Sequence, residues 1–209
     1  MYLKGISLRN FRNYENLELR FDRKFNIIYG LNGQGKTNIL EAVYLCALGR
    51  SHRTSRDLEL VRFGEGIYEV NTYVAKKDMD ISIEIVYEKN SKKKIKINDI
   101  PAKKVGKLMG QLNVVMFSPE DMVLVKDGPS ERRRFLDITI SQLRPSYFYD
   151  LQQYIKILAQ RNNLLKEIGE DRKLADTLEV WDENIVKTGS RIIMKRQAFI
   201  KRMGVIAQG

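Results

Sequence analysis

A glycine-rich segment near the N-terminus has the residue types and spacing that hold a phosphate group. It matches the pattern G-x-x-x-x-G-K-[ST], with one extra glycine inside the loop: Gly30, Leu31, Asn32, Gly33, Gln34, Gly35, Lys36 and Thr37. Glycines give the backbone conformations that a side chain would block, so successive N–H groups can converge on one anion. In such loops the lysine bridges the β- and γ-phosphates and the hydroxyl ligates Mg²⁺, the roles expected for Lys36 and Thr37. The segment therefore predicts a site for ATP and Mg²⁺.

The elements on either side of this loop agree with that prediction. Phe25–Tyr29 is a short apolar run, which predicts a strand covered on both faces. From Lys36 to Leu48 apolar residues recur at helical spacing, and Gly49 is placed as the C-terminal cap. A strand, a glycine loop and a helix in this order are typical of a P-loop fold, and the helix N-terminus adds partial positive charge.

Alternating apolar and polar residues predict further strands. Runs of period two occupy Tyr2–Leu8, Leu17–Phe21, Tyr68–Val74 and Ile81–Tyr87. The last two are separated by a short turn and predict a hairpin. Lys94–Ile97 predicts a basic strand at a sheet edge, and Leu112–Phe117 a buried core strand that leads into a helix start at Ser118–Asp121. The predicted fold class is α/β: a P-loop nucleotide-binding lobe, similar to ABC and SMC heads, with an added antiparallel β-sheet.

Beyond Pro129 the pattern becomes helical. Ser130 is placed to cap a helix that carries Arg132–Arg134, which could face DNA or a second subunit. Two series with coiled-coil spacing then follow, from Tyr147 to Ile168 and from Leu174 to Phe199. They predict an antiparallel helical arm about 35 Å long, broken near Gly169.

The predicted domains are therefore residues 1–129, the N-terminal part of an ATPase head, and residues 130–209, a helical arm truncated at its C-terminal end. Tyr147, Tyr154 and Trp181 fall on seam positions of the arm, where packing is favoured over base stacking.

Composition limits the partners and the compartment. A net charge of +11 favours phosphate-rich partners, nucleic acid above all, and Lys92–Lys94 is the candidate for non-specific phosphate contact. The chain contains no apolar run long enough to span a bilayer, so no membrane association is expected. The single cysteine, Cys46, lies in an apolar run and predicts core packing in a reducing, cytoplasmic compartment. The single histidine, His52, leaves little basis for a histidine-based metal site, and it is as well explained as a loop residue as by contact with a phosphate or an interface.

Several blocks together resemble the RecF family, bacterial recombination mediators related to ABC-type and SMC ATPases. The similarity rests on Phe11–Tyr14, Gly33–Asn38, Gly49–Thr54, Phe117–Asp121 and Arg132–Asp137. It implies an ATP-dependent, head-to-tail homodimer that loads at DNA gaps or single-strand/double-strand junctions with the partners RecO and RecR. It also implies that Arg12 and Asn13 lie close to the nucleotide, and that Ser118–Asp121 occupies the position of a loop that senses the γ-phosphate.

The chain departs from the family in one respect. Neither a signature segment nor a Walker B strand occurs in it, and Leu178–Glu183 only imitates the latter. No catalytic residue is therefore expected within this fragment, which should bind nucleotide weakly and hydrolyse it hardly at all, whereas the full-length protein would be an ATPase.

Two other P-loop classes compete with this interpretation. An SMC-type structural ATPase would have a much longer coiled coil than the break at Gly169 allows. A small-molecule P-loop kinase would carry a lid after the first helix, where this sequence predicts an antiparallel sheet. A GTPase is disfavoured because no N-K-x-D segment occurs.

Overall fold

The computed structural model describes residues 1–118, 123–126, 128–169 and 172–208. The chain divides into two compact units, Met1–Ser118 and Pro119–Gly209. The predicted start of the Ser118–Asp121 helix lies, after Ser118, outside the described residues. The functional division of the chain at residue 129 stays a prediction.

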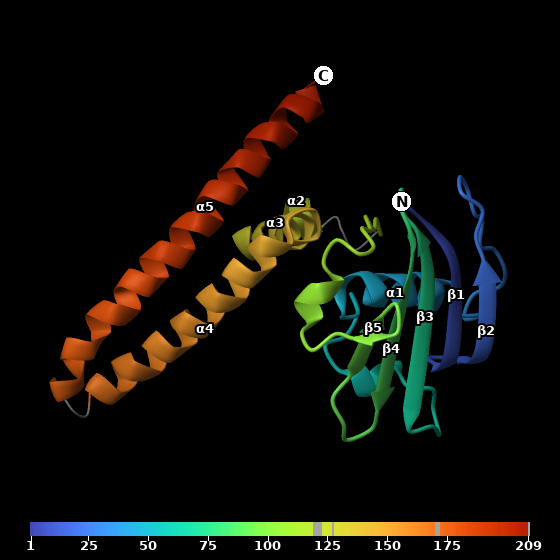
Figure 1. Cartoon of the computed structure of the whole chain (residues 1–209), viewed down its shortest axis with the longest axis horizontal. Helices are drawn as coiled ribbons and strands as arrows, with labels where there is room; N and C mark the ends of the chain where they lie inside the picture. The colour runs from blue at the N-terminus through green and yellow to red at the C-terminus, as the bar shows by residue number, and fades with distance from the viewer. Residues whose placement is uncertain (119–122, 127, 170–171, 209) are drawn as a thin grey trace. The chain divides into compact units, whose positions relative to one another are not determined.

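The first unit is built on one antiparallel sheet (Figure 1). Its strands are β1 (Tyr2–Phe11), β2 (Tyr14–Arg20), β3 (Ile67–Ala75), β4 (Asp80–Glu88), β5 (Lys94–Ile97) and β6 (Ile100–Pro101). Their order across the sheet is β2-β1-β3-β4-β5-β6. The first two predicted strands and the hairpin are confirmed. The prediction that β5 forms a sheet edge is wrong, because β6 pairs with its last two residues.

One face of the sheet is covered by helix α1 (Lys36–Leu48), which lies behind the strands in Figure 1. Because side chains alternate between the two faces of a strand, every second strand residue points toward this helix. These strand side chains and the apolar side chains of α1 are buried against one another. The fully buried side chains of this core include Ile6, Leu8, Phe11, Tyr68, Val70, Ile83 and Ile85 from the sheet, and Ala42, Leu45, Cys46 and Ala47 from α1. The helix ends as predicted at Gly49, whose φ is 71° and whose N–H donates to the carbonyl of Leu45 at 2.7 Å.

Two segments predicted as core strands are not strands. Phe25–Tyr29 is irregular, with Phe25 88% and Tyr29 89% exposed, and in Leu112–Phe117 only Leu112 is buried, while Val115 is 96% exposed. An apolar segment becomes a buried strand only when neighbours satisfy its N–H and C=O groups and cover its side chains. Within the described residues, neither segment pairs with a strand of the sheet.

The second unit is helical. It contains α2 (Val123–Lys126), α3 (Pro129–Leu143), α4 (Pro145–Ile168), a 3₁₀ segment at Arg172–Thr177 and α5 (Leu178–Gln208). The 24 residues of α4 correspond to about 36 Å, close to the predicted length of the arm, whereas the 31 residues of α5 correspond to about 46 Å. The helix break is confirmed at the end of α4. Helix α3 begins one residue before Ser130, because Pro129 takes the first helical position, so Ser130 is not the cap.

Helices α4 and α5 lie side by side along the arm (Figure 1). Their contact with α3 forms a small core of Ile140, Tyr147 and Ile192, with Tyr154 among the side chains packed against it. Arm packing is therefore confirmed for Tyr147 and Tyr154. No helix in the part of the chain that the structure describes is long and apolar enough to cross a membrane.

Candidate functional site

The glycine-rich loop enters α1 directly, with its backbone in conformations that favour glycine. The φ angles of Gly30, Gly33 and Gly35 are 147°, 80° and 93°, all in the region that side chains rarely adopt. The side chains of Leu31 and Asn32 are exposed. The loop therefore offers mainly its backbone groups to a ligand, as expected of a phosphate-binding loop.

The start of α1 is open to an anion. No side chain caps the helix, so its first N–H groups remain available to a phosphate. The ammonium group of Lys36 donates to the carbonyl oxygens of Gly30 at 2.8 Å and Leu31 at 2.7 Å. Among the described residues no acidic side chain pairs with this ammonium, so its charge is available to a phosphate. Thr37 is exposed beside it and fits the role of a Mg²⁺ ligand.

The turn between β1 and β2 lies against this loop. Asn13 donates from Nδ2 to the carbonyl of Gln34 at 3.2 Å, and the hydroxyl of Tyr14 donates to the same oxygen at 3.3 Å. Asn13 in turn accepts a hydrogen bond from Asn38 at 2.8 Å. A side chain at Gly35 would meet Oδ1 of Asn13 at 2.4 Å, so the turn and the loop are in close contact. The structure therefore brings Asn13 to the loop.

Arg12 lies next to Asn13 but points elsewhere. Its guanidinium forms two hydrogen bonds with the carboxylate of Glu41, at 2.9 and 2.7 Å, and a third to the carbonyl of Glu59 at 2.8 Å. Bidentate pairs of this kind are among the stronger hydrogen bonds in proteins. The closeness of Arg12 to a nucleotide stays a prediction, because its described contacts hold it against the side of α1.

Glu41 is the residue of this region that the sequence did not reveal. Its side chain is fully buried, and besides Arg12 it accepts a hydrogen bond from Ser51 at 2.5 Å and lies 3.7 Å from Arg53. Burial alone would raise the pKa of Glu41. Hydrogen bonds from Arg12 and Ser51, with the charges of Arg12 and Arg53, outweigh burial and hold that pKa below its ordinary value. The available signal was one acidic residue among the apolar positions of a helix.

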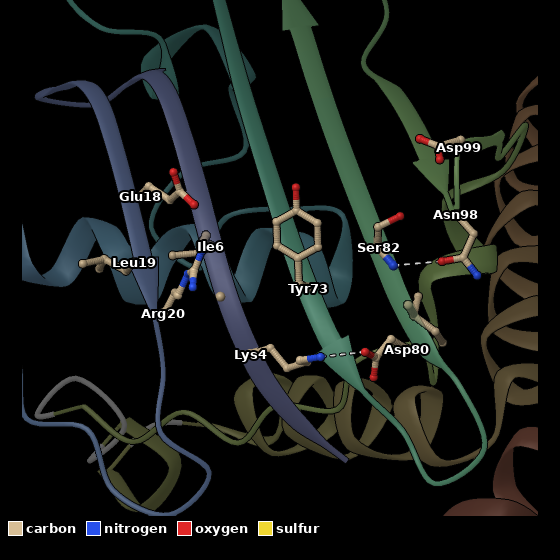
Figure 2. A pocket seen from close by; sticks show the side chains of 12 residues that line it. Lys4, Ile6, Glu18, Leu19, Arg20, Tyr73, Asp80, Ser82, Asn98 and Asp99 are labelled. Atoms are coloured by element: carbon tan, nitrogen blue, oxygen red, sulfur yellow. Dashed lines mark hydrogen bonds and ion pairs between the residues drawn. The ribbon is translucent and has the colours of Figure 1, made fainter.

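A hollow in the surface of the first unit lies away from the loop, on the face of the sheet opposite α1 (Figure 2). Gly5 has no side chain there, and Tyr73 stands beside it, half exposed. An ion pair between Lys4 and Asp80, 2.7 Å apart, crosses one end of the hollow. The lining mixes both signs of charge and does not select one class of ligand.

The structure also places the other candidate residues named above, Cys46, Lys92–Lys94 and His52. Burial raises the pKa of Cys46 to about 12, so its thiol is core filler and not a nucleophile. Lys93 pairs with Asp57 at 2.6 Å, which leaves Lys92 and Lys94 of the predicted phosphate contact exposed. The ring of His52 packs edge-on against that of Tyr44.

The sequence is similar to a well-defined set of known proteins. It matches the family described as AAA domain over residues 6–202. It is 56% identical over 208 residues to the DNA replication and repair protein RecF of Acetivibrio thermocellus, covering 100% of this chain and 56% of that relative. It is 48% identical over 208 residues to the protein of the same name from Agathobacter rectalis, covering 100% and 58%. The chain thus spans about half the length of the curated relatives it matches.

The fold is also similar to those of solved structures. A structure of the recombination mediator protein RecF-ATP in the RecFOR pathway superposes with a TM-score of 0.91 at 45% identity, covering 96% of this chain and 54% of that one. A structure from work on ATP-driven dimerization of SMC ATPases superposes with a TM-score of 0.53 at 22% identity, covering 66% and 99%. The second likeness concerns the fold alone. The predicted P-loop fold class, with its antiparallel sheet and helical segment, is confirmed.

Proposed function

Because this chain belongs to the RecF family, we propose that it is the nucleotide-binding part of a recombination mediator and that it binds ATP with Mg²⁺ at residues 30–37. The observation that carries the proposal is the loop geometry. Three glycines with positive φ lead into an uncapped helix, beside a lysine whose charge no acidic group among the described residues neutralises. The similarity to RecF-ATP supports ATP as the phosphate-bearing ligand.

The whole protein acts on DNA in this proposal. The net charge of +11 supports a phosphate-rich partner, and the RecFOR pathway of the similar structure supports RecO and RecR as partner proteins. ATP would join two subunits head to tail, the dimer would hold DNA at a gap or a single-strand/double-strand junction, and hydrolysis would release it. Ligand binding would thus shift a population between free and DNA-holding states.

In this proposal, hydrolysis of ATP requires the longer protein. The chain contains no Walker B or signature motif, and the segments 25–29 and 113–117 have no neighbouring strands within the described residues. We propose that the part of the longer relatives not covered here supplies both the catalytic acids and those neighbours. The chain alone would then bind ATP weakly and hydrolyse it hardly at all.

A titration with a fluorescent ATP analogue, with and without Mg²⁺, tests this function. Lys36→Met is expected to abolish saturable binding, because the loop loses its one ammonium group. Lys77→Met removes an exposed lysine from the β3–β4 turn and is the matched control, expected to bind as the original chain does. The same pair in a protein extended to the full length of the relatives should show loss of ATP-dependent dimerisation only for Lys36→Met. ATP-stimulated dimerisation that survives Lys36→Met would contradict the proposal.

An SMC-type structural ATPase is the second candidate, supported by the likeness of fold to an SMC ATPase. The arm argues against it, because α4 ends after 24 residues, far short of a long coiled coil.

A further inference from the structure

The contacts of Glu41 reach the phosphate-binding loop through a continuous series of side chains. Arg53 lies 3.7 Å from Glu41, and its Nη1 donates to Asn38 at 3.2 Å. Asn38 donates to Asn13 at 2.8 Å, and Asn13 donates to the carbonyl of Gln34 at 3.2 Å. Three separate segments of the first unit are therefore tied to one buried carboxylate.

The turn that carries Asn13, and the end of β1 that leads into it, contain two residues with left-handed backbone conformation. Arg12 has a φ of 57° and Asn10 a φ of 49°, both in the left-handed region. Such residues persist only where surrounding contacts determine them. For Arg12 those contacts are the two hydrogen bonds to Glu41 and the bonds of its side chain and backbone N–H to the carbonyls of Glu59 and Leu60.

The hydrogen bonds that Asn13 and Tyr14 donate to the carbonyl of Gln34 orient the N–H of Gly35. In a trans peptide the C=O and the following N–H point in opposite directions, and the chain contains no cis peptide within its described residues. Because the carbonyl of Gln34 points at Asn13 and Tyr14, the N–H of Gly35 points away from the turn. If that peptide rotated, a carbonyl oxygen would take the place of an N–H donor and repel a phosphate.

We propose that Glu41 is a positioning residue for the nucleotide site. It holds Arg12 and Arg53 so that Asn13 fixes the Gln34–Gly35 peptide with its N–H available to phosphate. Glu41 itself does not touch the ligand. The inference rests on the proposed binding of ATP at residues 30–37, and it assigns a function to a residue that no motif marks.

The test uses two substitutions, singly and together, in the protein at the full length of its relatives. Glu41→Gln keeps the shape of the side chain and removes its charge. Asn13→Asp keeps the acceptor for Asn38 and removes the donor to Gln34. Each is expected to weaken Mg²⁺-ATP binding about tenfold, because Glu41→Gln loses one of the two hydrogen bonds from Arg12 and Asn13→Asp loses the hydrogen bond to Gln34. Glu84→Gln, which removes the partner of Lys96 elsewhere on the sheet, is the control and should leave binding unchanged.

The double variant separates positioning from general damage. If Glu41 acts through Asn13, the double variant binds ATP no more than about tenfold more weakly than the original protein, because the second change has nothing left to remove. Losses that multiply to about a hundredfold would overturn the inference. So would a Glu41→Gln protein with a lower melting temperature and unchanged affinity.

The two proposals fail in different ways. If the original protein shows no ATP binding that depends on Lys36, the proposed function fails and this inference with it. If the original protein binds ATP and both Asn13→Asp and Glu41→Gln bind it equally well, only this inference fails. Should Glu41→Gln not fold, Asn13→Asp still tests whether the hydrogen bond to Gln34 positions the loop, because Asn13 is exposed in a turn outside the core, and unchanged ATP binding by Asn13→Asp would overturn the inference.

Discussion

Among single residues, Glu41 combines complete burial with a pKa that its hydrogen-bond partners hold below the ordinary value. A buried carboxylate is tolerated when it is paired and hydrogen-bonded, and removal of one member of such a group destabilises a protein by about 3–5 kcal/mol. The two hydrogen bonds from Arg12 and the one from Ser51 meet that condition. The stability of the first unit is therefore coupled to the protonation of this side chain.

The pH dependence of stability should reveal this coupling. Because the pKa of Glu41 in the folded state lies below its ordinary value of 4.5, its contribution is complete above pH 4.5 and is lost as the pH falls through the folded-state pKa. Glu41→Gln lacks that contribution. We expect the difference in free energy of unfolding between the two proteins to be about 3 kcal/mol at pH 7 and to shrink below pH 4.5. Urea unfolding from pH 7 to 3 measures it, and a constant difference would contradict the prediction.

Gly35 offers a second test at this scale. Alanine there would be strained at a φ of 93° and would meet Asn13 at 2.4 Å, so Gly35→Ala should lose nucleotide binding and about 1–3 kcal/mol of stability. Gly66→Ala is the matched control, because Gly66 has no neighbour within 4 Å of an added side chain. Thermal unfolding and the ATP titration check both proteins. Equal behaviour of the two alanine variants would show that the contact with Asn13 is unimportant.

The site residues that lie close together along the sequence could be predicted, whereas those that are far apart along the sequence could not. Lys36, Thr37 and the glycines could be predicted because the motif that marks them lies within eight consecutive residues. Arg12 and Glu41 are 29 residues apart, and their pairing depends on how β1 and α1 pack. A sequence without aligned relatives carries no signal for such a contact.

At the scale of elements, the same distinction explains the two wrong strand predictions. Alternation in β3 and β4 identifies strands because each supplies the other with a partner nearby in sequence. The run at 25–29 is as apolar as a core strand, yet composition says nothing about which segment pairs with it. The α1 helix could be predicted because its hydrogen bonds are internal and its glycine cap is adjacent.

The helical unit depends on a polar contact among three helices. Asp137 accepts hydrogen bonds from Nη2 of Arg196 at 2.8 and 2.9 Å, from Nε of Arg196 at 3.0 Å, and from the hydroxyl of Tyr147. Asp137→Asn should destabilise this unit by about 2 kcal/mol, because Arg196 is left partly buried with a neutral partner. Glu183→Gln, an exposed change on α5, should alter stability by less than about 0.5 kcal/mol. Chemical denaturation followed by helix circular dichroism distinguishes them, and equal midpoints would contradict the prediction.

At the scale of the whole molecule, the proposed DNA binding by a protein of the relatives' full length should depend on the charge of +11 that this chain contributes. Each phosphate neutralised by Lys or Arg releases condensed counterions, so affinity for a duplex with a single-stranded overhang should fall at least about tenfold between 50 and 200 mM salt. Fluorescence anisotropy at several salt concentrations gives the slope. A flat response would mean that the positive charge serves something other than DNA.

The uncovered apolar segments at 25–29 and 113–117 also have a consequence for biosynthesis. A ribosome that makes a protein as long as the curated relatives needs roughly ten to thirty seconds, at about 5–20 residues per second, to add the remaining half of such a protein. Throughout that time the nascent chain would display Phe25, Tyr29, Val115 and Phe117 to its surroundings. Chaperones that bind exposed apolar stretches would find their sites there, and conditions that slow translation would lengthen the interval in which half-made molecules can stick to one another.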